Sequence, residues 1–314
     1  MSGHSTMPWV EKYRPAIFDN IVLDSNNKRI FSNIIETNSF PNLLLYGPPG
    51  TGKTTTAINL INRYQERYSQ KNKGLMIHLN ASDERGIDII RNQISQFVNA
   101  KALFSENGLK IVVLDEIDYM TKNAQQALKY LLQDYHENVR FCLICNYISR
   151  IDDSLQNELL HIRFNQLPVA DIIDFLENIS VKEKLSIPKK IIYQIQKMFK
   201  SDIRSMVNYI QSNQYDINIK KVVNDELWNN LSITIKHKDD RNTKQYVEYI
   251  QTEYAMSDII IIKQYINYLI YNKKDLLCAD FLNFCEYIIH VQAPNAEYLR
   301  NYFIKKIVHW AHLL

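Results

Sequence analysis

Glycine, proline and cysteine are scarce in this sequence, and long apolar runs are missing. Seven Gly and eight Pro in 314 residues do not supply long flexible linkers, and no low-complexity tract is present. The longest apolar stretch, from Ile259 to Ile270, contains Lys263 and Gln264 and is too short to cross a bilayer. The first residues lack the apolar core of a secretory signal. We therefore expect a soluble, intracellular protein with no membrane partner.

The chain also lacks a strong charge of either sign. Lys and Arg number 37 and Asp and Glu 34, so the formal net charge is only +3. Any contact with nucleic acid must then come from local basic patches and not from overall charge.

The four cysteines fall in two pairs. Cys142 and Cys145 form a C-x-x-C, which is compatible with a metal or redox site, but no second C-x-x-C or closely spaced His pair completes a zinc site. Their apolar surroundings favour a buried strand instead, since free Cys is among the most buried residue types. We expect Cys278 and Cys285 to be core residues as well, and nothing requires an oxidising compartment.

The first half of the chain alternates short apolar runs with helical patterns, which predicts an α/β domain with a parallel sheet over residues 1–167. The expected strands are Leu43 to Tyr46, Leu75 to Leu79, Ile111 to Leu114 and Phe141 to Cys145. The expected helices between them are Thr54 to Tyr68, Ile87 to Val98 and Asn123 to Tyr135, with Ile87, Ile90, Ile94 and Phe97 as one buried stripe.

The strand signal ends near Pro168. Residues 168–213 carry three helical patterns, Ala170 to Glu183, Lys189 to Phe199 and Asp202 to Gln211, and predict a small all-helical domain. The polar segment from Ser212 to Asn224 is a candidate linker, and residues 224–314 predict a second helical domain.

The segment after the first strand fits G-x-x-x-x-G-K-[ST] and opens a helix, which is the context that a phosphate-binding loop needs. Its glycines let backbone N–H groups point at phosphate oxygens, and the helix N-terminus adds a favourable dipole. Lys53 would contact the outer phosphates and the Thr54 hydroxyl would bind Mg²⁺. The expected nucleotide contacts here are Gly47, Pro48, Pro49, Gly50, Thr51, Gly52, Lys53, Thr54 and Thr55.

Two carboxylates follow the third expected strand. Asp115 and Glu116 end an apolar run, and in open α/β sheets ligands bind at the carboxyl ends of strands. Asp115 would hold Mg²⁺ through water, and Glu116 would act as the general base for the attacking water. ATP and Mg²⁺ are therefore the expected cofactors.

Two further polar residues are candidates for the catalytic site. Asn146 ends the fourth expected strand, where it could position a water near the γ-phosphate, although a lone Asn after a strand is more often a turn residue. Arg204 begins a helix with a good cap and could reach back over the nucleotide. By composition alone, Arg204 is more often a solvated surface residue.

Several segments resemble the small subunits of replication factor C, the AAA+ ATPases of sliding-clamp loaders. The similarity covers roughly residues 8 to 212, and the first and third of the segments that carry it are more specific to clamp loaders than the ATP motifs. They are Pro8-Trp-Val-Glu-Lys-Tyr-Arg-Pro15, the phosphate loop, Leu79-Asn-Ala-Ser-Asp-Glu-Arg-Gly-Ile-Asp88 with Arg91-Asn-Gln-Ile94, Leu114-Asp-Glu-Ile-Asp118 and Met120-Thr with Ala124-Gln-Gln-Ala-Leu128.

The resemblance implies an α/β AAA+ P-loop NTPase domain over residues 1–167, a helical lid over 168–213 and an all-α collar over 224–314 that closes a hetero-pentameric ring. It implies other loader subunits, a sliding clamp and primer–template DNA as partners. It places the protein in the nucleus if the source is eukaryotic, and otherwise in the cytoplasm or a viral replication compartment. It assigns Val10, Tyr13 and Arg14 to the adenine pocket, and Asn146 and Arg204 to two sensor roles.

For DNA, the resemblance directs attention to Arg85 and Arg91 at the start of the helix near Ile87. Guanidinium groups and backbone N–H groups there can both meet phosphates, in contacts that are independent of sequence and weakened by salt. The alternative is a pair of solvated arginines. The clamp-facing segment would include Phe97, Leu103 and Phe104, although the first of these also continues the buried stripe.

The sequence departs from the family at one functional position. Where the family carries Ser-Arg-Cys, whose Arg reaches a neighbour's γ-phosphate, the chain holds Asn157-Glu158-Leu159. Such an arginine finger is worth about 10³–10⁵ in rate. Because a carboxylate here replaces the guanidinium, we expect the chain not to complete a neighbour's ATP site. Arg150 or Arg163 could substitute from a shifted position. Lys129-Tyr130, where two arginines are usual, and Ser201, where Gly is common, also differ.

Two other functions remain open at this point. A subunit that binds ATP only to hold a ring together would not need Lys53, Thr54, Asp115 and Glu116 intact, and all four are present. A different AAA+ machine, such as a Holliday-junction motor or an origin-loading factor, would not need the N-terminal arm or the Asn-Ala-Ser-Asp-Glu-Arg-Gly segment.

Overall fold

A computed structural model describes residues 7–68, 73–82, 87–99, 108–134, 139–215, 223–237, 240–254, 256–291 and 295–314. The chain divides into two compact units, Met1–Asn218 and Ile219–Leu314. Each unit has its own hydrophobic core. No helix of the described part is long and apolar enough to span a membrane.

The first unit is built on a five-stranded parallel sheet with the order β2-β3-β4-β1-β5. The strands are β1 (Leu43–Tyr46), β2 (Met76–Asn80), β3 (Lys110–Asp115), β4 (Val139–Cys145) and β5 (Leu160–Arg163). The first four confirm the apolar runs of the sequence. The fifth was not predicted, because it is an edge strand in which only Ile162 is buried.

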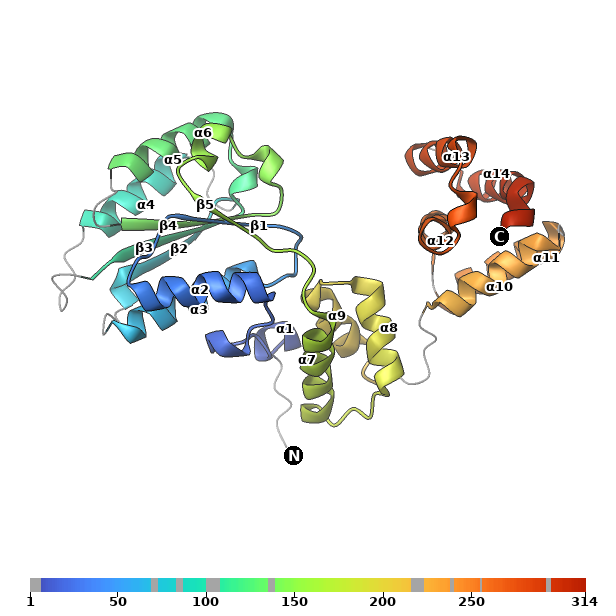
Figure 1. Ribbon diagram of the computed structural model, residues 1–314, viewed down its shortest axis with the longest axis horizontal. Coiled ribbons are helices and arrows are strands. Elements are labelled where there is room, and N and C mark those ends of the chain that lie inside the picture. The colour runs from blue at the N-terminus through green and yellow to red at the C-terminus, as the bar shows by residue number, and fades with distance from the viewer. Residues whose placement is uncertain are drawn as a thin grey trace. The chain divides into compact units, whose positions relative to one another are not determined.

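Helices cover both faces of this sheet (Figure 1). Leu43 and Leu45 pack against α2 (Ser25–Thr37) and α3 (Lys53–Arg67), whereas Leu44 packs towards α4 (Ile87–Asn99), α5 (Lys122–Asp134) and α6 (Asp153–Gln156). Successive side chains of a strand point to opposite faces, so a strand that is buried on both sides needs an apolar residue at every position.

The same alternation decides the C-x-x-C motif. Cys142 lies in the core on one face of the sheet and Cys145 in the core on the other, because their spacing of three residues is odd. Both are buried, and burial raises the pKa of Cys145 to about 12. Both side chains are buried among apolar residues on opposite faces of the sheet, which confirms the core interpretation.

Three helices follow the sheet and complete the first unit: α7 (Val169–Lys182), α8 (Lys189–Phe199) and α9 (Ile203–Ser212). We call them the lid helices. Their core includes Trp9 of α1 (Trp9–Lys12), so the N-terminal arm is packed into the lid helices and not into the sheet.

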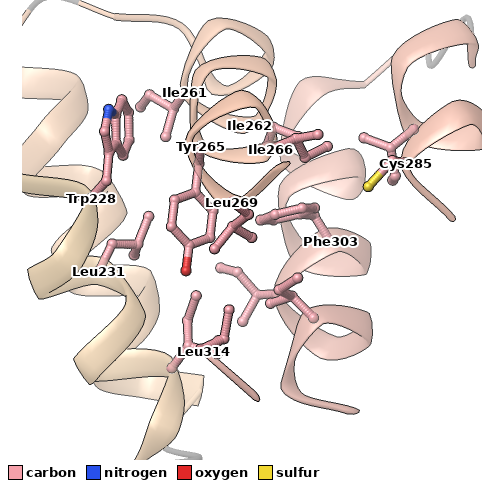
Figure 2. Close-up of a cluster of buried hydrophobic side chains, with 14 of the residues drawn as sticks. Trp228, Leu231, Ile261, Ile262, Tyr265, Ile266, Leu269, Cys285, Phe303 and Leu314 are labelled. Carbon is pink, nitrogen blue, oxygen red and sulfur yellow. The ribbon is translucent and has the colours of Figure 1, made fainter. Parts of the chain in front are cut away.

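The second unit contains five α-helices in its described part: α10 (Asp225–Lys236), α11 (Asp240–Tyr254), α12 (Asp258–Asn272), α13 (Ala279–His290) and α14 (Ala296–Ile307). Their core is large and aromatic (Figure 2). Tyr265 is fully buried at its centre, and its hydroxyl lies 2.8 Å from Ser232 Oγ. Cys285 is buried here as expected, but Cys278 is exposed, because it precedes the first turn of α13 and not its buried face.

Candidate active site

The phosphate loop joins β1 to α3 with three glycines at positive φ, namely Gly47 at 140°, Gly50 at 73° and Gly52 at 84°. These conformations are disfavoured for residues with a Cβ atom. Space is a second constraint at two of them. A Cβ on Gly47 would lie 2.1 Å from the carbonyl oxygen of Phe164, and one on Gly50 would lie 1.8 Å from Asp202 Oδ1.

Lys53 is folded back into this loop and is 7% exposed. Its ammonium donates to the carbonyl oxygens of Gly47 and Pro48, each at 2.8 Å, and to Asn146 Oδ1 at 2.9 Å. Burial lowers the pKa of Lys53, while the nearby carboxylate of Asp115 acts to raise it. The loop carbonyl oxygens thus accept the hydrogen bonds that Lys53 would otherwise donate to anionic phosphate oxygens.

Thr54 and Asp115 form the pair that was expected to hold Mg²⁺. Thr54 Oγ1 donates to Asp115 Oδ2 at 2.5 Å, and the other carboxylate oxygen accepts from the backbone N–H of Glu116 at 2.9 Å. Burial acts to raise the pKa of Asp115, but hydrogen bonds from His78, Thr54 and Glu116 outweigh it and lower the pKa. A hydroxyl beside an ionised carboxylate is a hard-oxygen pair that fits Mg²⁺.

Glu116 has an unusual backbone. It follows β3 with φ 58° and ψ 36°, the left-handed region, which is uncommon for a residue with a side chain. Its carboxylate has no hydrogen-bond partner within the described residues, and it lines one cavity with Asn146 and Arg204. Backbone strain of this kind concentrates at active sites.

Asn146 follows β4, and its backbone is held by a residue from the neighbouring strand connection. Asp118, in the short turn Ile117–Tyr119, accepts at 3.3 Å from the N–H groups of both Asn146 and Tyr147. The Asn146 side chain meets Lys53, as described above. The structure therefore brings Asn146 to the phosphate loop.

Arg204 lies in the first turn of α9, next to the phosphate loop. Asp202 caps this helix by accepting from the Ser205 N–H at 3.0 Å, and the Ile203 N–H donates to the Gly50 carbonyl oxygen at 3.1 Å. Arg204 itself is exposed and lines the cavity, close enough for its charge to act to lower the pKa of Lys53. It thus faces the phosphate loop and not bulk solvent alone.

The N-terminal arm also lines the cavity, whose volume is about 180 Å³. Val10, Tyr13 and Arg14 all line it. Glu183 of the α7 C-terminus accepts from the Tyr13 hydroxyl and from the Lys12 ammonium, each at 2.5 Å. The arm also contacts α3, where Arg14 Nε donates to Thr55 Oγ1 at 3.1 Å.

The other loop residues of the sequence prediction, Pro49, Gly50, Thr51, Gly52 and Thr54, line the same cavity, and Pro48 contributes its carbonyl to Lys53. The predicted nucleotide residues therefore line one cavity, except for Gly47 and Pro48, whose carbonyl oxygens accept from Lys53.

Of the residues expected to meet DNA or a clamp, Arg85, Leu103 and Phe104 lie outside the described residues. Arg91 is exposed on α4, one turn into the helix. Phe97 is half-buried against the sheet, with Lys110 Nζ 5.5 Å from its ring centre, so it belongs to the core.

Glu158 lies near the amino ends of β5 and β1, whereas the phosphate loop follows the carboxyl end of β1. It is exposed, it lies two residues before the start of β5, and it accepts from Gln133 Nε2 at 2.8 Å. Arg163 is in register with Tyr46, the last residue before the loop, so it lies at the edge of the chain's own phosphate site. Arg150 lies over the Tyr147 ring, 5.0 Å from its centre.

Two residues of the site were not given a role from the sequence. Asp118 is 6% exposed and bonds to the backbone at Asn146. His78 Nε2 lies 3.9 Å from Asp115 Oδ2, because β2 pairs with β3 and ends at the same edge. A polar residue near the end of each apolar run was visible in the sequence, but the order of the strands was not.

Comparisons with known proteins agree with this geometry. Residues 43–167 match the model of the ATPase family associated with various cellular activities. Human replication factor C subunit 5 is 40% identical over 207 residues, 66% of this chain and 60% of that protein. Subunit 3 of Schizosaccharomyces pombe is 36% identical over 212 residues, 68% of this chain and 61% of that protein.

A longer match is replication factor C subunit 3 of Blastobotrys adeninivorans, which is 31% identical over 278 residues, 88% of this chain and 79% of that protein. Among solved structures, the RuvB Holliday junction branch migration motor of Thermotoga maritima has a TM-score of 0.53 at 15% identity, over 83% of this chain and 91% of that one. At that identity the likeness concerns the fold alone.

Proposed function

The chain belongs to the replication factor C family of AAA ATPases, and on that premise we propose that it is an ATP-hydrolysing subunit of a sliding-clamp loader in DNA replication. In this proposal ATP binding lets a ring of different subunits grip and open a clamp. Primer–template DNA then enters, and hydrolysis releases the clamp on the DNA. The chain spans about 60% of the length of the first two relatives, so these activities and partners are proposed and not carried over.

One observation carries the proposal: the groups that phosphoryl transfer needs surround a single cavity. The cation of Lys53, the oxygens of Thr54 and Asp115 and the carboxylate of Glu116 lie at the carboxyl edge of the sheet, and Arg204 faces them from the lid helices. Catalysis of this reaction depends mainly on positioning and charge, which these residues supply.

Each residue has a distinct proposed role. Lys53 leaves the loop carbonyls to neutralise the outer phosphates. Thr54 and Asp115 would hold Mg²⁺, which when bound neutralises phosphate charge. Glu116 orients a water and accepts its proton, a role for which an unpartnered carboxylate is suited. The remaining two groups, Asn146 and Arg204, contact the γ-phosphate region.

The lid helices would sense the nucleotide through direct contact with the loop. The Ile203 N–H bonds to the Gly50 carbonyl, and Asp202 packs where a Cβ of that glycine would be. A phosphate that reshapes the loop must therefore shift α9 as well. This contact supports a mechanism in which ATP sets the lid position and, through it, the shape of the ring.

We further propose that the chain does not complete a neighbour's ATP site. Glu158 occupies the position of the family's finger, and a carboxylate near a γ-phosphate would repel it. Glu158 lies away from the chain's own phosphate loop. This supports the proposal that its position faces a neighbour's ATP site and no longer supplies a finger there. Arg163 lies at the carboxyl end of β5, beside the chain's own phosphate loop, and so is badly placed to replace the finger. Hetero-oligomerisation follows, because a ring of this chain alone would have no finger.

DNA contact is proposed for the start of α4. Arg91 is exposed there, and a guanidinium near the start of a helix is a group that can meet a phosphate. The contact would be independent of sequence and would weaken as salt rises.

Co-purification tests the proposal. The tagged chain is isolated from its native source, and the masses of the bound proteins are determined. The proposal expects other AAA+ subunits in one complex of fixed stoichiometry, and a ring-shaped clamp that joins when ATP is added. A complex that carries no clamp in ATP, and instead binds four-way DNA junctions, would favour a branch-migration motor.

A further inference from the structure

Asp118 is a buried carboxylate whose role the proposed mechanism does not use. It lies in the turn after β3 and is 6% exposed. One oxygen, Oδ2, accepts from two consecutive backbone N–H groups, those of Asn146 and Tyr147, each at 3.3 Å. The other oxygen, Oδ1, is buried without a hydrogen-bond partner among the described residues.

A carboxylate in this position is a costly way to support a fold. Burying a charge without a full set of partners is unfavourable, and a buried polar atom without a partner calls for an explanation. Asp118 also acts to raise the pKa of Lys53, so its charge is felt at the phosphate loop. Asp118 does not itself line the cavity, so its effect on the site passes through Asn146, which does.

The side chain of Asn146, whose backbone Asp118 holds, bonds to Lys53 in this structure. Asn146 Oδ1 accepts from the Lys53 ammonium at 2.9 Å, in the same position where that ammonium also meets two loop carbonyls. When Lys53 moves to a phosphate, the Asn146 amide loses this bond. It can then meet the terminal phosphate only if its backbone is fixed independently of Lys53.

We propose that Asp118 is a positioning residue that fixes the backbone of Asn146, so that the freed amide contacts the γ-phosphate and the chain distinguishes ATP from ADP. The inference rests on the ATP-binding function proposed above. Asp118 acts through Asn146 and touches no nucleotide itself.

The test is equilibrium binding of fluorescent methylanthraniloyl-ATP and methylanthraniloyl-ADP, with Mg²⁺, to the full-length chain. Asp118→Ala is expected to reduce the preference for ATP about tenfold, the equivalent of one hydrogen bond to a charged group, with ADP affinity unchanged. Asp118→Asn retains an acceptor for the two N–H groups and should keep the preference to within about threefold.

A double-mutant cycle separates positioning from general support. Asn146→Ala should lose the same preference, and adding Asp118→Ala to it should change nothing more. Gln125 provides a matched control, because it is 1% exposed and bonds to the carbonyls of Met120 and Arg150 without touching Asn146. Gln125→Ala should lower the melting temperature and leave the nucleotide preference intact.

Three results would overturn the inference while leaving the proposed function in place. They are equal weakening of ATP and ADP by Asp118→Ala, an additive double mutant, and a wild-type chain that binds both analogues equally through Lys53. A wild-type chain that binds neither analogue would instead overturn the proposed function and the inference with it.

Discussion

At the residue scale, the ammonium of Lys53 has two alternative sets of partners. In this structure it bonds to two loop carbonyls and to Asn146 Oδ1, and in the proposed complex it bonds to phosphates. The general-base role proposed for Glu116 is independent of that exchange, because its carboxylate has no hydrogen bond to Lys53 among the described residues. Nucleotide binding and hydrolysis should therefore be separable by mutation.

Glu116→Gln makes that separation measurable. The amide cannot accept a proton, so we expect turnover to fall by about 10²–10⁴ while the affinity for ATP stays within a few fold. Steady-state ATPase of the assembled complex and equilibrium binding give the two numbers. Unchanged total ATPase would instead indicate a subunit that binds ATP only to hold the ring together.

The sequence predicted most residues of this site because they lie in motifs with a fixed local geometry. Asp118 was different, since its partners are backbone N–H groups, which no sequence pattern displays. His78 was missed because its approach to Asp115 depends on β2 lying beside β3. Arg204 was a candidate from its place at a helix start, but the resemblance was needed to favour it over a solvated surface residue.

At the scale of elements, the contact between the phosphate loop and α9 links the sheet to the lid helices. The glycine pattern predicted the curled loop, but Gly50 has a second reason that only the structure shows, namely the carboxylate of Asp202 against its backbone. The edge strand β5 was missed for a related reason. Only Ile162 of its four residues is buried, so it has no apolar run.

Gly50→Ala and Gly52→Ala are a matched pair for this contact. Both glycines have positive φ, so each substitution costs about 1–2 kcal/mol of backbone strain. At Gly50 the new Cβ would also lie 1.8 Å from Asp202 Oδ1, whereas at Gly52 nothing lies within 4 Å. We expect urea unfolding to show a further loss of about 1–3 kcal/mol for Gly50→Ala alone. Equal losses would show that the lid contact contributes nothing.

The helices of the second unit offer a test of their own core. Tyr265 is buried among apolar side chains (Figure 2), and its hydroxyl lies 2.8 Å from Ser232 Oγ. Tyr265→Phe should reduce the free energy of unfolding by about 1 kcal/mol, the worth of one hydrogen bond. Tyr265→Ala should cost about 3–5 kcal/mol, because it leaves a cavity.

Tyr298, 70% exposed, is the control for these two variants. Tyr298→Phe should change the free energy of unfolding by less than about 0.5 kcal/mol. If Tyr265→Ala behaved like this surface variant, the helices would not share the packed core described here.

At the scale of the whole molecule, the chain carries the residues of the proposed ATP site and an acid, Glu158, where we expect the family's finger for the next subunit. A finger is worth about 10³–10⁵ in rate, so its loss is tolerable only where no neighbouring site depends on it. We therefore predict a subunit that supplies no finger to a neighbour's ATP site. Its own site either receives a finger from the other neighbour or works without one.

Glu158→Ala tests this asymmetry. If Glu158 completes no site, the ATPase of the assembled complex should stay within about twofold of wild type, in contrast to the loss of a working finger. Gln133→Ala removes the same 2.8 Å hydrogen bond from the other side and controls for local structure. A fall of tenfold or more with Glu158→Ala alone would show that this position acts at a neighbour.

The central claim is that a nucleotide held by Lys53 and the carboxylates of β3 drives a ring that acts on a clamp and DNA. Its most direct test is ATP turnover by the co-purified complex, measured with and without clamp and primed DNA, for wild type and for Lys53→Ala. The account predicts turnover that rises when both are added, and a smaller rise in the variant. Turnover that ignores clamp and primed DNA, or is identical in the two complexes, would contradict it.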